Sequence, residues 1–305
     1  MIPAAAPPPP GQNVVLGIAL RLGATIAFGI MAALIKLASD AGASAPELVF
    51  YRSAFALVPI ALWIVGSRRF HAWRTHRPLA HVGRGMIGLT SMFLSFGALT
   101  LLPLAEAVTL SFVAPLFAVA LSALLLGEPV GRYRWGAVAI GLIGVVVVMQ
   151  PAGSGLHPIG LVLAITGALS VASATIAIRQ LGSTESAETT ALWFTIFSML
   201  ASALVMPVFA QGHPGWLWGI LVALGIFGGI GQLLMTASLR AAPVGAVVPF
   251  DYAHLIWAVL LGWLLWDTHP GATTWAGAAI IVASGLYTIY RERKLGRDKP
   301  RPEPL

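Results

Sequence analysis

The sequence LPLAEAVTLSFVAPLFAVALSALLL, residues 102–126, decides the fold, and a similar stretch recurs in the second half of the chain: APVGAVVPFDYAHLIWAVLLGWLLW, residues 242–266. Each stretch holds about 20 almost uninterrupted apolar residues, the length that an α-helix needs to cross the hydrocarbon core of a bilayer. The two stretches also share a leading proline in the same register, Pro103 and Pro243. The chain is therefore expected to contain membrane helices that recur in two halves.

The composition extends this expectation to the whole chain. Of 305 residues, 58% are hydrophobic and only 10% are charged, whereas a soluble globular protein carries roughly 25% charged residues. So few charges could not cover the surface of a soluble fold of this length. The chain has no cysteine, which excludes disulfides, thiolate chemistry and thiolate metal sites.

Ten apolar segments follow one another along the chain, with Gly, Pro or charged residues between them. They cover residues 14–38, 46–66, 80–101, 104–126, 132–149, 157–179, 188–208, 216–239, 244–266 and 272–290. Residues 1–13 are rich in Pro and Ala and are expected to form a disordered tail. Residues 291–305 are expected to form a basic cytoplasmic tail. These features predict an all-α integral membrane protein with ten transmembrane helices.

The lysine and arginine residues predict how these segments are oriented. If the N-terminus is cytoplasmic, the external connections hold none of the eighteen, and three lie within segments: Arg21, Lys36 and Arg52. The other fifteen lie in or beside cytoplasmic connections and the C-terminal tail: Arg68, Arg69, Arg74, Arg77, Arg84, Arg132, Arg134, Arg179, Arg240, Arg291, Arg293, Lys294, Arg297, Lys299 and Arg301. The positive-inside rule therefore places both termini in the cytoplasm and the protein in the inner, cytoplasmic membrane. The net charge of +7 is a signature of topology and does not indicate nucleic acid as a partner.

The two halves of the chain match at a constant offset of 140, which we call the repeat offset. The matching pairs that composition bias explains least are Gly85 and Gly225, Gly88 and Gly228, Pro103 and Pro243, and Trp135 and Trp275. The halves, residues 14–149 and 157–290, hold five segments each. Because five is odd, the second half must enter the membrane in the opposite orientation. Inverted repeats of this kind underlie alternating access, with the binding site near the membrane midplane.

Several stretches resemble the drug/metabolite transporter superfamily, in its EamA-like branch. They are RLGATIAFGIMAALIKLASDAG (21–42), FYRSAFAL (50–57), GALTLLPLAEAVTLSFVAPLFAVALSALLLGEPV (97–130) and VVPFDYAHLIWAVLLGWLL (247–265). The resemblance implies ten helices in two inverted five-helix repeats around a central cavity, with both termini cytoplasmic. Members carry amino acids, nucleosides, riboflavin-like cofactors, quaternary amines and other metabolites, so the resemblance implies the class of activity and leaves the cargo open.

The charges inside the segments do not follow the repeat. Ionisable groups at membrane depth are costly, and they usually face a cavity or a partner. At the repeat offset, each of these charged residues has a neutral counterpart: Arg21 has Leu161, Arg52 has Leu192, Glu106 has Ala246 and Asp251 has Ser111. Arg21 and Asp251 lie at similar depths near the inner face and are expected to pair. Arg52 and Glu106 lie near the outer face, where a pair would be either structural or a gate.

Segment 244–266 concentrates the candidates for a substrate-binding or coupling site. Pro249 interrupts the helical hydrogen bonding, close to Asp251, Tyr252, His254 and Trp257. Because burial disfavours the charged form of both an aspartate and a histidine, Asp251 and His254 either carry protons or are held in a structural network. Trp257 is placed to stack on a planar substrate. Another candidate is Gln232, whose amide needs partners in hydrocarbon and is expected to line the cavity.

The most direct interpretation is a secondary active transporter for a small polar metabolite. An amino acid, a carboxylate-bearing compound or a cofactor-like compound would suit the surplus of cations at membrane depth, and proton coupling would suit Asp251. A lipid scramblase is the alternative from another class. The sequence contains no His-Glu-x-x-His, Gly-x-Ser-x-Gly or Walker motif, so neither an enzyme, a cofactor nor a metal site is expected. The expected partners are the metabolite, a proton and membrane lipid, in a monomer or a dimer.

Overall fold

The computed structural model describes residues 13–68, 73–75, 77–126, 131–149, 156–181, 187–242 and 244–297. The described residues form helices and no strand, so the predicted all-α fold is confirmed. The first half contains α1 (Val14–Asp40), α2 (Ala45–Gly66), α3 (Pro78–Leu101), α4 (Leu104–Ser111), α5 (Ala114–Leu126) and α6 (Arg132–Met149). The second half contains α7 (Pro158–Leu181), α8 (Ala187–Ala203), α9 (Met206–Phe209), α10 (Gly215–Ala241), α11 (Val244–Val247), η2 (Val248–Tyr252), α12 (Ala253–Trp266) and α13 (Ala272–Arg297). The predicted tail of residues 1–13 lies almost wholly outside the described residues, and only the first part of the basic tail lies within them.

These helices have the length and composition of membrane spans. Within the described ranges, nine spans are long and apolar enough to cross a membrane. The tenth predicted segment, 188–208, is divided between α8, of 17 residues, and the four-residue α9. The protein is therefore a multi-pass membrane protein, with roughly ten spans.

Three of the predicted helices are interrupted, each next to a proline. Segment 104–126 breaks between α4 and α5, ahead of Pro115, and segment 188–208 breaks ahead of Pro207. Segment 244–266 passes through the 3₁₀ turn η2, which contains Pro249. Proline lacks the amide hydrogen and clashes with the carbonyl one turn earlier, so the helix cannot continue unchanged. The expected interruption at Pro249 is confirmed, and the segments 104–126 and 188–208 are each divided by a short turn as well.

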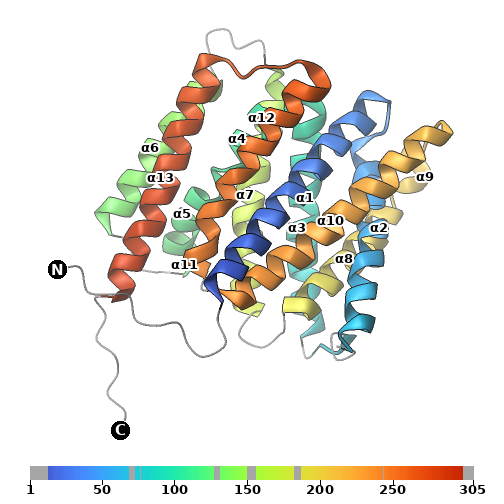
Figure 1. The fold of residues 1–305 in the computed structure, drawn as a ribbon, viewed down its shortest axis with the longest axis horizontal. Helices are drawn as coiled ribbons and strands as arrows, with labels where there is room; N and C mark the ends of the chain where they lie inside the picture. Colours follow the sequence, from blue (N-terminus) through green and yellow to red (C-terminus); the bar gives the residue numbers. More distant parts are fainter. Residues whose placement is uncertain are drawn as a thin grey trace.

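The packing of the helices follows the repeat offset. At that offset α1 corresponds to α7 and α3 to α10, and α1 packs along α10 just as α7 packs along α3. A further pair, α6 with α13, joins corresponding elements of the two halves directly, and α4 packs on α12, which belongs to the segment that corresponds to 104–126. Figure 1 shows α6 beside α13 on one side of the bundle and α1 beside α10 towards the other. Swapping the two halves turns the pair α1–α10 into the pair α7–α3, as a two-fold relation between the halves requires.

The matching glycines serve this packing. A Cβ on Gly225 of α10 would overlap Phe55 of α2 and would lie 2.8 Å from the carbonyl oxygen of Tyr51. Its counterpart Gly85 of α3 faces Phe197 of α8 in the same way. In membranes helices associate largely by close packing, which small residues at the interface permit. The repeated glycines therefore hold equivalent helix pairs together in the two halves.

Both ends of the described chain lie at the same end of the bundle. The start of α1 and the end of α13 are at the lower end in Figure 1, and we call this end the terminal end. The opposite end carries the last turn of α1 and the first turn of α2. There, Ser44 and Glu47 form a capping box, in which the Ser44 amide and hydroxyl both donate to the Glu47 carboxylate, at 2.7 and 2.8 Å.

Candidate functional site

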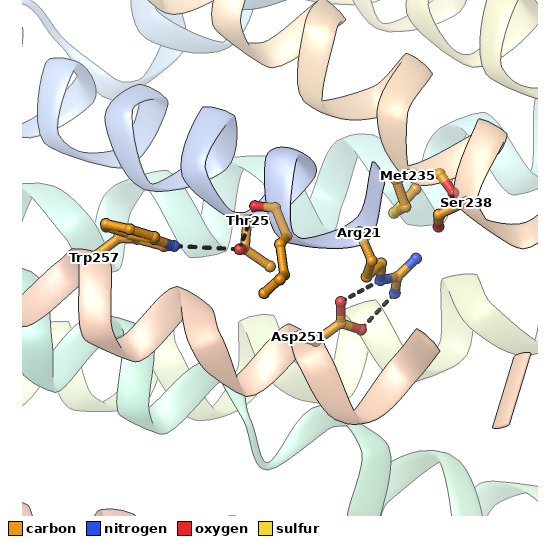
Figure 2. Close-up of polar contacts among 7 residues, drawn as sticks. Arg21, Thr25, Met235, Ser238, Asp251 and Trp257 are labelled. Carbon is orange, nitrogen blue, oxygen red and sulfur yellow. Dashed lines mark hydrogen bonds and ion pairs between the residues drawn. The ribbon is translucent and has the colours of Figure 1, made fainter. Parts of the chain in front are cut away.

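Arg21 of α1 and Asp251 of η2 form a two-pronged ion pair, as the sequence predicts. Nε of Arg21 donates to Oδ1 of Asp251 and Nη2 donates to Oδ2. Figure 2 shows the two side chains pointing toward each other from different helices. The Arg21 side chain is buried, whereas the Asp251 side chain is 38% exposed. The pair joins the first half of the chain to the second and leaves the carboxylate accessible.

That accessibility comes from a cavity of about 480 Å³ near the terminal end. The Arg21–Asp251 pair forms part of its wall, between α1, α5, α7, α13 and η2. The other polar residues of the wall are Ser111, Ser122, Arg134, Thr175 and Thr288. A cavity with two cationic side chains, one carboxylate and several hydroxyls can hold a polar solute, because each kind of polar group finds a partner there.

A second, smaller cavity of about 160 Å³ lies deeper in the bundle. Phe28, Met31, Ser95 and His254 line it, and Ser111 lines both cavities. Ser111 is the counterpart of Asp251 at the repeat offset. Ser111 at the end of α4 therefore places a hydroxyl at the position where Asp251 in η2 places a carboxylate.

Tyr252 and His254 follow Asp251 along the chain, on η2 and α12. The Tyr252 ring packs on Phe112, with ring centroids 5.0 Å apart, and its hydroxyl packs against Gly285. The imidazole of His254 lies against α1 at Gly29. The Tyr252 hydroxyl and Nε2 of His254 are buried, and neither has a hydrogen-bond partner among the described residues. His254 lines the smaller cavity, so its Nε2 lies beside a space that can hold a solute or water.

Trp257 is held by α1. Its Nε1 donates to the Thr25 hydroxyl at 3.3 Å, and that hydroxyl donates to the Leu22 carbonyl at 2.8 Å, as Figure 2 shows. The Trp257 side chain packs over Gly29. It belongs to the seam between α1 and α12, beside the ion pair.

The structure does not bring Arg52 and Glu106 together, so the expected outer ion pair is wrong. Arg52 lies on α2, which packs on α10 and α8, whereas Glu106 lies on α4, which packs on α12 and α7. Oε1 of Glu106 accepts from the Thr274 hydroxyl at 3.2 Å. The Arg52 side chain runs along Gly228 of α10. Residues at the same depth do not meet when their helices are not neighbours.

Gln232 lies on α10, half-buried, and lines neither of the two cavities described above. Its main-chain carbonyl accepts from the Thr236 hydroxyl at 2.8 Å. The expectation that its amide lines the cavity stays a prediction.

Sequence reasoning did not include Arg84 or Glu47 among the candidate site residues. Arg84 counts as a cytoplasmic-side charge in the sequence, yet it is only 8% exposed and its guanidinium lies 3.8 Å from the centre of the Phe194 ring. Glu47 is fully buried, although it lies only two residues inside α2. The available signal was the alignment of Arg84 with Gly88, Ser91 and Ser95 on one polar helix face.

At the opposite end, hydrogen bonds join the two halves. The Glu47 carboxylate accepts from the main-chain amide of Gln211 at 2.9 Å and lies 2.8 Å from Nε2 of His213. Nε1 of Trp266 donates to the Asp40 carboxylate at 2.7 Å. These contacts tie the ends of α1 and α2 to the second half of the chain.

Comparison with known proteins agrees with this architecture. The model of the EamA-like transporter family matches residues 15–150 and 158–290. The chain is 29% identical over 279 residues to the pseudopaline exporter of Pseudomonas aeruginosa, covering 91% of this chain and 97% of the relative. It is 27% identical to the riboflavin transporter of Rhizobium johnstonii (94% and 95% covered) and 28% identical to the S-adenosylmethionine uptake transporter of Rickettsia prowazekii (81% and 84% covered).

A solved crystal structure also matches, with a TM-score of 0.60 and 26% identity over 90% of this chain and 98% of that one. The family match spans almost all of the described helices, on both sides of the middle of the chain. The protein is therefore a member of the EamA-like transporter family, within the drug/metabolite transporters.

Proposed function

We propose that the protein moves a small polar metabolite across the cytoplasmic membrane by alternating access, with both termini in the cytoplasm. The observation that carries this proposal is the Arg21–Asp251 pair, which joins the two halves of the chain and faces a cavity near the terminal end. The similarity to transporters of pseudopaline, riboflavin and S-adenosylmethionine supports a small organic cargo.

The charge distribution supports an inward-facing state. In the sequence, fifteen of the eighteen lysines and arginines lie in or beside the connections on the same side as the two chain ends, and the positive-inside rule assigns that side to the cytoplasm. The cavity of about 480 Å³ lies near this end, while Glu47 and Asp40 tie the halves together at the other end. Opening the outer side requires these contacts to break and the inner parts of α1 and η2 to stay together.

We propose that Asp251 couples a proton to this movement. Its carboxylate is paired with Arg21 and is reached from the cavity. Protonation would weaken the two charge-assisted hydrogen bonds from Arg21. It would thereby release α1 from η2, a segment whose helix is already interrupted at Pro249. Protons and the movement of the halves would then be linked through one contact.

Transport into proteoliposomes tests this proposal. Purified full-length protein would be reconstituted and offered radiolabelled riboflavin and S-adenosylmethionine, with and without an imposed pH gradient. We expect saturable uptake of at least one compound, faster with the gradient. A parallel assay with a fluorescent lipid addresses the scramblase alternative: lipid scrambling without uptake of either compound would overturn the proposal.

A further inference from the structure

We infer that Arg52 and Arg84 form an anion-binding site inside the bundle, which holds the carboxylate or phosphate group of the transported metabolite. The inference that the bound anion is part of the transported metabolite rests on the proposed function, whereas the inference of an anion-binding site does not. The two guanidinium groups come from different helices, α2 and α3, and the residues are 6% and 8% exposed. The two helices pack against each other.

Two corresponding glycines make room for these side chains. Nη1 of Arg84 lies 3.0 Å from the position that a Cβ would take on Gly88 of α3. Nε of Arg52 lies 3.2 Å from the same position on Gly228 of α10. Gly88 and Gly228 match at the repeat offset and so occupy equivalent places in the two halves. The two cations therefore lie along matching surfaces of α3 and α10.

Neither cation has a counter-ion among the described residues. Nε and Nη1 of Arg84 are buried without a hydrogen bond, and the only partner of its guanidinium there is the Phe194 ring. Arg52 makes no hydrogen bond or ion pair with a described residue. The helix carboxylates whose side chains the structure describes have other partners: Asp40 has Trp266, Glu47 has Gln211 and His213, Glu106 has Thr274, and Asp251 has Arg21. Glu188 also takes part in an interaction.

Two buried cations without an anion are unfavourable, because an arginine side chain cannot escape by losing its proton. The fold does not require them. At the repeat offset Arg52 corresponds to Leu192 and Arg84 to Leu224, and both leucines are buried. The same places are thus filled by apolar side chains in the other half. The charges are explained if an anion from outside the chain binds between them.

A solute in the smaller cavity can reach this site. Met31 lines that cavity, and its sulfur lies 2.9 Å from the Cβ position of Gly228, beside Arg52. A methionine side chain is flexible and adapts to its surroundings, so we expect a change of its rotamer to open a way to Arg52. Guanidinium groups bind the oxygens of a carboxylate or phosphate in pairs, and the contact with Phe194 holds the Arg84 plane in place. One end of the metabolite would then face His254 while its anionic group faces the arginines.

The substitutions that test this inference are taken from the other half of the chain. Arg52→Leu and Arg84→Leu install the residues found at positions 192 and 224. Arg132→Leu, at an exposed position on α6, is the matched control, and Arg52→Gln and Arg84→Gln serve if a leucine variant does not fold. Thermal unfolding of the full-length protein in detergent micelles would be measured with increasing sodium phosphate, sodium acetate or sodium chloride at constant ionic strength.

We expect phosphate or acetate to raise the Tm of the parent protein in a saturable way. The apparent affinity for that anion should fall about tenfold or more in each arginine variant, the loss of one charge-assisted contact. Each leucine variant should also have a higher Tm than the parent in buffer without phosphate or acetate, and Arg132→Leu should behave as the parent. A lower Tm together with an unchanged phosphate response would show that the cations are structural, and would overturn the inference. An equal response to chloride would overturn the assignment to cargo.

The transport assay separates this inference from the proposed function. Uptake of S-adenosylmethionine or riboflavin by the parent protein, with no anion-dependent change of Tm, would overturn the site and leave the function standing. The reverse result, a saturable phosphate effect that both arginine variants lose but no uptake of either compound, would support the site and count against the proposed function.

Discussion

Phe112 and Tyr252 occupy equivalent positions in the two halves of the chain, and their rings lie in contact, with centroids 5.0 Å apart. Each follows directly on a residue of the cavity wall, Ser111 in the first half and Asp251 in the second. Two equivalent residues can touch only close to the two-fold axis that relates the halves. The cavity therefore lies at the centre of the repeat, and its two equivalent wall residues differ in chemistry: one is a hydroxyl and the other a carboxylate.

Replacing the carboxylate should separate binding from coupling. We expect Asp251→Asn to abolish accumulation driven by a pH gradient while it leaves exchange across the membrane, because the amide keeps the shape and cannot take up a proton. Asp251→Glu should do less harm. Uptake of S-adenosylmethionine and riboflavin into proteoliposomes, with and without the gradient, measures this. Asp267→Asn is the control, since the Asp267 side chain is 91% exposed. Undiminished accumulation in Asp251→Asn would assign Asp251 a purely structural role.

The close packing of α10 on α2 gives a prediction about stability. Gly225→Val should lower the Tm, because the new side chain would overlap Phe55 and approach the Tyr51 carbonyl; overpacking of this kind costs about 1–3 kcal/mol. Gly219→Val, on the same helix, meets no atom within 4 Å and should leave the Tm nearly unchanged. Thermal unfolding of both variants in the same detergent makes the comparison. Equal Tm values for the two variants would contradict the packing of α10 against α2.

The buried carboxylate at the opposite end should control the closure of that side. Glu47→Ala leaves the Gln211 amide and His213 without their partner, and a buried group that loses its partner costs about 1–3 kcal/mol. We expect more frequent opening at the opposite end, followed with a reporter at Ser111→Cys in the cysteine-free chain. A membrane-impermeant maleimide added outside the cell should label this cysteine faster in Glu47→Ala than in the parent. Asp267→Ala, an exposed change at the same end, should not alter the rate.

The charge distribution predicts the orientation of the protein. A reporter fused after Leu305 should be active only as a cytoplasmic reporter, and one inserted between Gln211 and Gly212 only as an external reporter. Alkaline phosphatase, which is active only after export, would report an external position, and a fluorescent protein that folds only in the cytoplasm would report a cytoplasmic one. An exported C-terminal reporter would contradict the assignment of the terminal end to the cytoplasm.

The sequence predicted the helices well because long apolar runs leave little choice of structure in a membrane. It also predicted the Arg21–Asp251 pair, because the two residues have similar depth, and the structure makes α1 and η2 neighbours. The same argument failed for Arg52 and Glu106, since depth says nothing about which helices are neighbours. Arg84 was missed for a related reason: its position near the start of a segment suits a loop charge, and only the packing of α3 shows that its side chain points inward.

The charges of the bundle lie on a duplicated scaffold in which their counterparts are neutral. In an inverted repeat whose halves were identical, exchanging the conformations of the halves would convert the inward-facing form into an outward-facing form of equal free energy. Arg52 opposite Leu192, and Asp251 opposite Ser111, remove that degeneracy. These unequal charged positions contribute to the resting population of the two forms, so each of them is a place where a single substitution is expected to shift which side of the membrane the empty protein faces.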